Sequence, residues 1–258
     1  MVLPLFDDNS DRTITPFVNY GLIAANIFVF VFLQQLGTNE HFTYAFSTVP
    51  AEILTGRDAV TPTRILVDAM TGQRLQVPGL EVTPGSVYFT LLTSMFMHGG
   101  LAHIGGNMLF LWIFGDNIED RLGHLRYLAF YLVCGLIASL AHVLTTAAFA
   151  TSQSSLLVPS LGASGAISGV LGGYVLLHPT RRVTVILFRF LTDVPAWVAI
   201  GIWFAFQLIS GLGMLGSGSQ QGGVAYAAHI GGFIAGLILI KVFDIGSRSK
   251  RASGYQGY

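Results

Sequence analysis

Long apolar segments separated by short polar ones dominate the hydropathy pattern of this chain. A helix needs about 20 mostly apolar residues to cross a bilayer, and six windows approach that length: 17–36, 93–115, 125–147, 164–178, 194–213 and 223–243. The fourth is the shortest, because its apolar part, Ser164 to His178, covers about 15 residues or roughly 22 Å of helix. The pattern predicts an all-α polytopic membrane protein with six transmembrane helices.

The composition is typical of a membrane protein and argues against several kinds of binding site. Of 258 residues, 52% are hydrophobic and 10% are charged, against about 25% charged in ordinary soluble domains. The net charge is zero, so nothing indicates nucleic-acid binding. Cys134 is the single cysteine, which excludes an intrachain disulfide or a cysteine-rich metal site.

The positive residues predict an orientation, since lysine and arginine near spans tend to stay in the cytoplasm. If the chain crosses the membrane six times, both termini lie on the same side, and ten of the 13 lysines and arginines lie on that side as well. We therefore expect residues 1–16 to form a cytoplasmic N-terminal segment. We also expect residues 17–243 to form the membrane domain, with a long outer loop at about 37–92, and residues 244–258 to form a basic, disordered cytoplasmic tail.

Four polar side chains lie in the outer-leaflet halves of the second, fourth and sixth spans. They are His103, Asn107, Ser164 and His229. His103 and Asn107 are four residues apart, which places them on one helix face. Ser164 follows Gly162 at the expected start of a helix, where N–H groups are unpaired and the helix dipole is positive. Ionisable side chains inside a membrane are costly and usually functional, so we predict that these segments meet in one site.

Four motifs give the chain a family resemblance. They are "HGGLAHIGGN" (98–107), "FGDNIEDRLG" (114–123), "GASGAISGVLG" (162–172) and "AHIGGFIAG" (228–236). They occur in order, one per expected helix, and the similarity extends through most of residues 88–243. The chain resembles the rhomboid family of intramembrane serine proteases. This implies a six-helix rhomboid-like bundle that cleaves transmembrane substrates.

The resemblance also assigns roles within the predicted site. Ser164 matches the nucleophile, His229 the general base, His103 and Asn107 the oxyanion-stabilising pair, and Gly162 the glycine preceding the nucleophile motif. The residue chemistry agrees, because a serine hydroxyl needs a nearby base and a neutral imidazole can take its proton. The spans contain no outer-leaflet aspartate or glutamate, so we expect a Ser–His dyad, a serine-type endopeptidase.

The expected partners follow from this assignment. They are transmembrane protein substrates and the lipid bilayer, with no nucleic acid, no metal and no cofactor. Topology and resemblance together predict an integral protein of the bacterial inner membrane, with its active site toward the outer face.

The sequence departs from some family members at two places. Position 168, where an aromatic residue can stack on the catalytic histidine, is Ser168, so the base is expected to be oriented by other contacts. The outer loop has no tryptophan and therefore lacks the tryptophan–arginine pair of some bacterial members. His98, just outside the second span, is expected to shape the outer edge of the site, with a solvated loop position as the alternative.

Glycine positions predict how the helices pack. Gly232 and Gly236 form a small-residue face below His229, and small residues let helix backbones approach closely. We expect this face to contact the glycine-rich start of the fourth helix and bring His229 to Ser164. The loop "GMLGSGSQQGG" (213–223) is a candidate lid, with an ordinary connector as the alternative.

Other functional classes remain to be weighed. A non-catalytic rhomboid-like protein that binds and escorts or retains membrane proteins would be expected to lack Ser164 or His229. A metal site built from His98, His103 and His229 would have no carboxylate or cysteine ligand and no HExxH pattern. A transporter would need a polar path through the bilayer, whereas the polar residues here gather at one depth.

Overall fold

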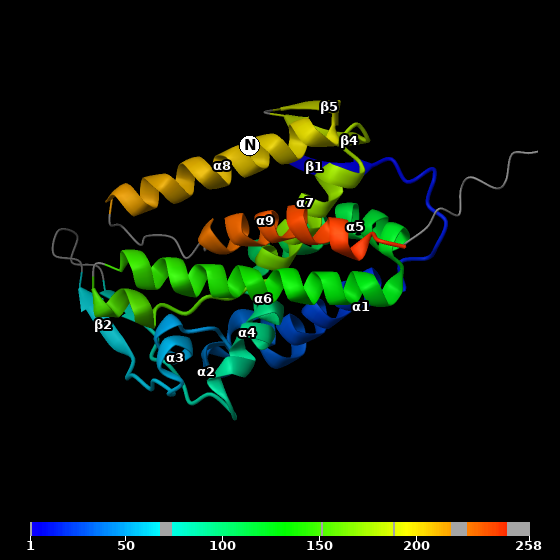
Figure 1. Ribbon diagram of the computed structural model, residues 1–258. Coiled ribbons are helices and arrows are strands. Elements are labelled where there is room, and N and C mark those ends of the chain that lie inside the picture. Colours follow the sequence, from blue (N-terminus) through cyan, green and yellow to red (C-terminus); the bar gives the residue numbers. More distant parts are fainter. Residues whose placement is uncertain (1, 68–73, 151, 188, 218–225, 247–258) are drawn as a thin grey trace, which may run out of the picture.

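Helices make up most of the computed structural model, which describes residues 2–67, 74–150, 152–187, 189–217 and 226–246 (Figure 1). A helix occupies each of the six predicted windows. They are α1 (Phe17–Phe28, continued by a π-helical turn at Val29–Leu33), α5 (Leu101–Leu122), α6 (His124–Phe149), α7 (Ser164–Leu177), α8 (Ala196–Ser217) and α9 (Tyr226–Phe243).

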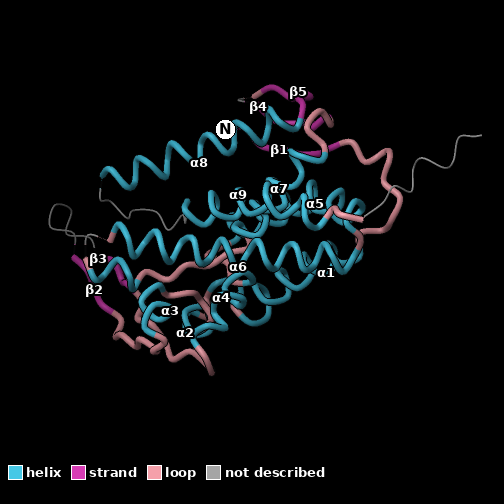
Figure 2. Tube along the Cα trace, viewed as in Figure 1, coloured by secondary structure: helices cyan, strands magenta, loops and turns pink. Residues whose placement is uncertain are grey.

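The short helix α7 is the centre of the bundle. It packs against α5, α6, α8 and α9, and every residue from Gly165 to Tyr174 is buried. Figure 2 shows α8 at the edge of the bundle, beyond α9. The predicted start of a helix at Ser164 is confirmed, because α7 begins at that residue.

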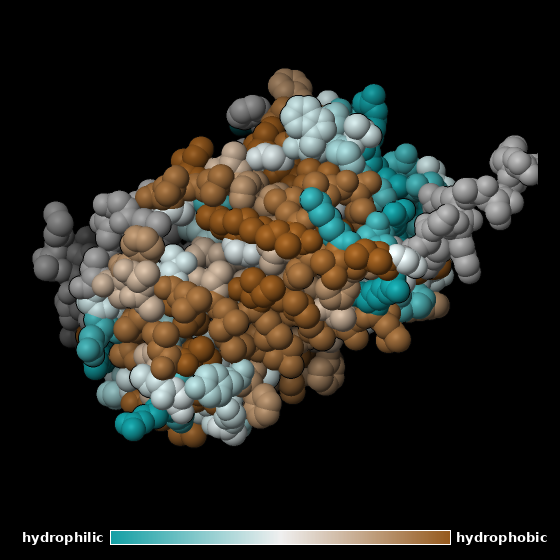
Figure 3. Space-filling model, viewed as in Figure 1, coloured by the Kyte–Doolittle hydropathy of each residue, from teal (hydrophilic) through white to brown (hydrophobic). Residues whose placement is uncertain are grey.

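Two of the described helices are long and apolar enough to cross a membrane on their own. These are α6 and α9, with mean hydropathies of 2.0 and 1.7, while the helical segments 17–33, 164–177 and 196–212 are shorter apolar helices. In α5 the polar side chains of its first turns and the charged ones near its end lower the hydropathy. The brown surface in Figure 3, flanked by teal residues at both ends, fits a protein embedded in lipid.

The all-α prediction is wrong in detail, since the described residues also include strands. β1 (Val2–Asp7), β4 (Arg182–Leu187) and β5 (Phe190–Pro195) form an antiparallel sheet in the order β1-β4-β5. A second antiparallel pair, β2 (Arg64–Val67) with β3 (Arg74–Val77), lies in the long loop. Strand β4 alternates, with Val183 and Val185 buried, a short period-two pattern that a search for 20-residue apolar windows overlooks.

The N-terminal segment is tied to the bundle through buried polar contacts. The Asp7 carboxylate accepts hydrogen bonds from the Tyr174 hydroxyl at 2.6 Å and from Asn117 Nδ2 at 2.7 Å. Burial is the main cause that raises the pKa of Asp7 to about 7. Arg12 forms an ion pair with Asp116 at 2.7 Å. The described part of the N-terminal segment, residues 2–16, is therefore attached to the bundle through Asp7 and Arg12.

The second predicted window is displaced from the helix that the structure contains. Met97 and Gly100 both have extended backbones, so α5 starts at Leu101 rather than at residue 93. It then runs past residue 115 to Leu122. The charged residues there are accommodated, because the Glu119 carboxylate accepts the backbone N–H groups of Val18 and Asn19.

The loop 37–92 contains structure of its own. It includes α2 (Glu40–Ala45), α3 (Pro50–Thr55), a 3-10 turn at Val87–Phe89 and α4 (Thr90–Thr93), which leads into a second 3-10 turn at Ser94–Phe96. Thr48 exchanges backbone hydrogen bonds with Ser160 at 3.0 and 2.8 Å, and its hydroxyl donates to Ser94 Oγ at 2.9 Å. The loop thus holds the segment that enters α7.

Candidate active site

Ser164 is presented by a constrained turn at the start of α7. Gly162 has a φ of +123°, a backbone conformation that residues with a Cβ rarely adopt. Its N–H donates to the Ser94 carbonyl at 2.8 Å. The turn therefore fixes the approach of the chain to α7 and places Ser164 among the helix residues whose N–H groups lack an intrahelical acceptor.

The Ser164 hydroxyl lies against the ring of His229. His229 is in the first turn of α9, and its Nε2 atom is 2.7 Å from Ser164 Oγ. Both groups are partly buried, and 65 residues of sequence separate them. The two predicted reactive groups are thus within hydrogen-bond distance.

Close packing of α7 and α9 produces this contact. A Cβ added at Gly232 would lie 2.1 Å from the Gly165 carbonyl oxygen, and one at Gly236 would lie 2.0 Å from that of Gly169. Those distances leave room for hydrogen only, so the two backbones touch. Because His229 lies on the same helix face one turn before Gly232, this contact brings its ring to the first turn of α7.

A third side chain, which our sequence reasoning missed, completes the arrangement around His229. Gln207 of α8 is buried, and its Oε1 atom is 2.9 Å from His229 Nδ1. Our reasoning considered only acidic residues as a third member. The sequence feature that could have identified Gln207 is that it is the one glutamine in the mostly apolar window 194–213.

Aromatic rings beside His229 come from other positions than the one occupied by Ser168. The Trp203 ring lies 6.1 Å from the histidine ring at 39°, and the Tyr226 ring lies 6.4 Å away, edge to face at 84°. Ser168 instead donates its hydroxyl to the Ser164 carbonyl at 2.6 Å. The histidine is thus oriented by contacts from α8 and α9.

His103 and Asn107 lie on one face of α5, next to the turn before Ser164. A Cβ at Gly162 would be 2.9 Å from His103 Nε2 and 3.7 Å from Asn107 Nδ2. The Gly99 N–H donates to His103 Nδ1 at 3.3 Å, so in the neutral ring the proton sits on Nε2. Two N–H donors therefore border the entry to α7.

His98 is buried, so the alternative prediction that it is a solvated loop residue is wrong. Its exposed fraction is 0%, and its Nε2 atom is 2.9 Å from Asn107 Nδ2. Gln34, a residue that our sequence reasoning passed over, holds the backbone of His98 through two hydrogen bonds of 2.9 and 3.0 Å. The His98 ring therefore lies next to Asn107 and contacts its amide. The sequence predicted only that His98 shapes the outer edge of the site.

A small cavity with both polar and apolar walls lies next to Ser164, beside α6 and α7. Its volume is about 20 Å³, and it is bordered by the hydroxyl-bearing residues Ser94, Ser139, Ser160 and Ser164. A space of this size holds about one water molecule. Among the described residues, no three histidine, cysteine, aspartate or glutamate side chains are grouped to hold a metal ion.

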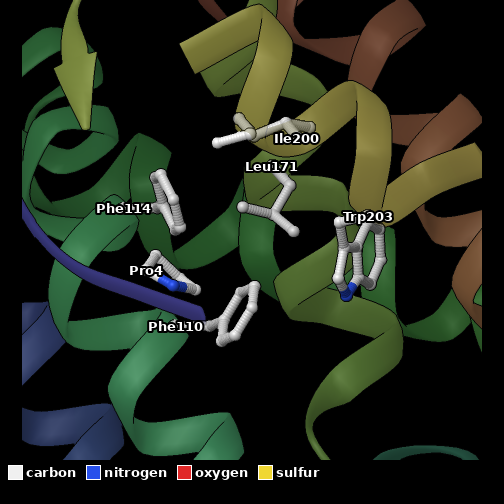
Figure 4. A pocket seen from close by; sticks show the side chains of 7 residues that line it. Pro4, Phe110, Phe114, Leu171, Ile200 and Trp203 are labelled. Carbon is white, nitrogen blue, oxygen red and sulfur yellow. The ribbon is translucent and has the colours of Figure 1, made fainter. Parts of the chain in front are cut away.

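An apolar pocket lies where β1, α5, α7 and α8 come together. Figure 4 shows its lining, with rings from α5 facing Pro4, Leu171, Ile200 and Trp203. The lining is entirely apolar, so this pocket provides packing rather than chemistry.

The fold and the site define a helical membrane protein with a serine–histidine pair inside its bundle, and comparison with known proteins names the group. The Rhomboid domain family matches residues 85–244. The chain therefore belongs to the rhomboid family.

Curated relatives are about a third identical to this chain over the aligned regions. "Rhomboid protein 1, mitochondrial" of Saccharomyces cerevisiae is 32% identical over 58% of this chain and 40% of its own length. "Rhomboid protease GluP" of Bacillus subtilis is 31% identical over 58% of this chain and 25% of its own length. The human "Presenilin-associated rhomboid-like protein, mitochondrial" is 31% identical over 57% and 36%. The matched regions thus span less than half of each of these relatives. Their names include mitochondrial proteins and a bacterial one, so similarity alone does not select a bacterial membrane.

Proposed function

We propose that this protein is an intramembrane serine endopeptidase that hydrolyses peptide bonds in or near the transmembrane segments of other membrane proteins. The observation that carries the proposal is the 2.7 Å separation of Ser164 Oγ and His229 Nε2. A serine hydroxyl becomes an effective nucleophile when a base at this distance accepts its proton. Retention of both groups in hydrogen-bonding geometry favours catalysis over a non-catalytic binding role.

The proposed reaction has two stages. His229 Nε2 accepts the Ser164 proton while Oγ attacks the peptide carbonyl carbon, and the protonated ring then gives that proton to the leaving amine as the C–N bond breaks. An ester remains on Ser164. A water molecule, for which the cavity beside Ser164 has room, gives its proton to His229 and attacks the ester, which releases the acid and regenerates the hydroxyl.

The negative oxygen formed in each stage needs donors. We assign this role to Asn107 Nδ2, His103 Nε2 and the Ser164 backbone N–H, in agreement with the placement of the first two beside Gly162. Pre-positioned donors of this kind stabilise the transition state more than the ground state.

The membrane arrangement is part of the proposal. Residues 17–243 cross the bilayer six times with both termini in the cytoplasm, and the site opens toward the outer face of the bacterial inner membrane. Substrates enter sideways from the bilayer, with α8 shifting to admit them. Residues 218–225 of the candidate lid and residues 247–258 of the basic tail lie outside the described residues.

A fluorophosphonate probe tests the proposal directly, because it reacts with activated serines. Purified protein in detergent is treated with the probe, digested and mapped by mass spectrometry, and in parallel incubated with a reporter transmembrane protein. We expect the label on Ser164 and cleavage of the reporter that the probe blocks. A folded protein that leaves the reporter intact and carries no label on Ser164 would overturn the proposal.

The Asn107→Ala variant tests the oxyanion assignment. Loss of one such donor typically lowers kcat by about 100- to 1,000-fold. We expect that loss with little change in KM, since the interaction forms mainly in the transition state. Steady-state kinetics on the reporter substrate measures both constants, and a kcat within about twofold of the wild type would remove Asn107 from this role.

A further inference from the structure

A polar contact joins α8 to the proposed catalytic histidine. We propose that Gln207 is the positioning residue of the site, fixing both the orientation and the tautomer of His229 so that Nε2 is free to accept the Ser164 proton. This inference rests on the proposed hydrolytic function and adds a third member to the pair expected from the sequence.

The atoms in contact determine the tautomer. Gln207 Oε1 is 2.9 Å from His229 Nδ1, and an amide oxygen can only accept a hydrogen bond. Nδ1 must therefore carry the ring proton. A neutral imidazole has one protonated nitrogen, so Nε2 carries a lone pair and faces Ser164 Oγ at 2.7 Å. The Gln207 contact thus selects the form of the ring that can act as a base.

The position of Gln207 on α8 agrees with this role. Trp203 and Gln207 are four residues apart, on one helix face, and both lie against the His229 ring. The stacked rings of Phe204 and Phe233, 4.1 Å apart at 22°, hold this part of α8 against α9. The neighbouring Phe206 points away from the bundle, with 61% of its surface exposed.

A glutamine suits this position better than an acid for a physical reason. In soluble serine hydrolases an aspartate holds the histidine in the productive tautomer, but a carboxylate inside a membrane carries a large free-energy cost. A neutral amide supplies the same acceptor oxygen without the charge. The titratable groups that act on His229 are His103 of α5 and His142 of α6, and neither takes the place of the Gln207 oxygen at Nδ1.

Two substitutions at this position separate positioning from packing. Gln207→Met keeps a side chain of similar length without an amide, whereas Gln207→Glu keeps an acceptor oxygen. We expect Gln207→Met to lower kcat about 10- to 100-fold, between the effect of one neutral hydrogen bond and that of a wrongly held catalytic tautomer. KM should change little. The rate of fluorophosphonate labelling should fall by the same factor, because the probe needs the same activated serine.

Gln207→Glu should recover most of the lost rate and move the acid limb of the pH profile to higher pH, since a carboxylate favours the charged ring. Phe206→Met, the matched change on the exposed side of α8, should behave as the wild type. Nitrogen-15 NMR of the histidine rings gives a readout independent of activity. It should show the proton of His229 on Nδ1 in the wild type and a mixture of tautomers in Gln207→Met.

The outcomes distinguish this inference from the function on which it rests. If the wild type cleaves and labels while Gln207→Met retains the wild-type kcat and tautomer, the positioning role is wrong and the hydrolase remains. Equal losses in Gln207→Met and Gln207→Glu, with raised KM and an unchanged tautomer, would also overturn it in favour of packing. A wild-type protein that neither cleaves nor labels would remove the proposed function itself.

Discussion

Replacement of Ser164 by alanine is expected to abolish peptide hydrolysis while leaving the fold unchanged. Only the oxygen that would form the bond to the substrate is lost, and alanine is compatible with the first turn of α7 because it has the highest helix propensity. Loss of a nucleophile in a serine protease lowers kcat by about 10⁶-fold, so no product should be detected above background. Quantitative immunoblotting of the reporter substrate measures this loss.

The His229→Ala variant and the double variant Ser164→Ala with His229→Ala test whether the two residues act together. Residues that act as one unit give non-additive losses, so Ser164→Ala with His229→Ala should be no less active than either single variant. Ser10→Ala makes the same serine change in an exposed turn and should keep wild-type activity. Cleavage by a folded Ser164→Ala protein at the wild-type rate would show that another group carries the reaction.

Helix positions are well encoded in this sequence because lipid imposes a strong local constraint. An apolar run of about 20 residues has few alternatives to a helix, and each predicted window indeed contains one. The start of α7 was also readable, since Gly162 and the apolar segment after Ser164 mark a helix boundary locally. The displaced start of α5 shows the limit, because the window 93–115 extends across Gly99 and Gly100 although α5 begins only at Leu101.

The strands and the full environment of His229 depend on information that is not local. Val2 pairs with Leu187, so β1 acquires its partner only when the ends of the bundle come together. Gln207 is the one glutamine in a mostly apolar helix, and its role depends on the rotation of α8 about its axis. Sequence reasoning therefore predicted the Ser164–His229 pair as a hypothesis but gave no reason to add α8 to it.

Replacement of Gly232 by valine is expected to lower activity about 100-fold without altering any residue of the proposed mechanism. Even the first added carbon would lie 2.1 Å from the Gly165 carbonyl oxygen and 3.0 Å from its carbonyl carbon. These are backbone atoms, so relief requires α7 and α9 to separate rather than a side chain to rotate. Overpacking usually costs about 1–3 kcal/mol, and a separation of even 1 Å between base and nucleophile can lower a rate by about 100-fold.

A matched glycine distinguishes this effect from a general intolerance of valine in membrane helices. A Cβ at Gly201 of α8 would meet nothing within 4 Å, so Gly201→Val should retain cleavage and thermal stability. Gly232→Val should show this loss of cleavage, and its melting temperature in detergent should fall. If it melted and cleaved as the wild type does, the two backbones would not be in contact, and Ser164 and His229 would have to be brought together by some other part of the bundle.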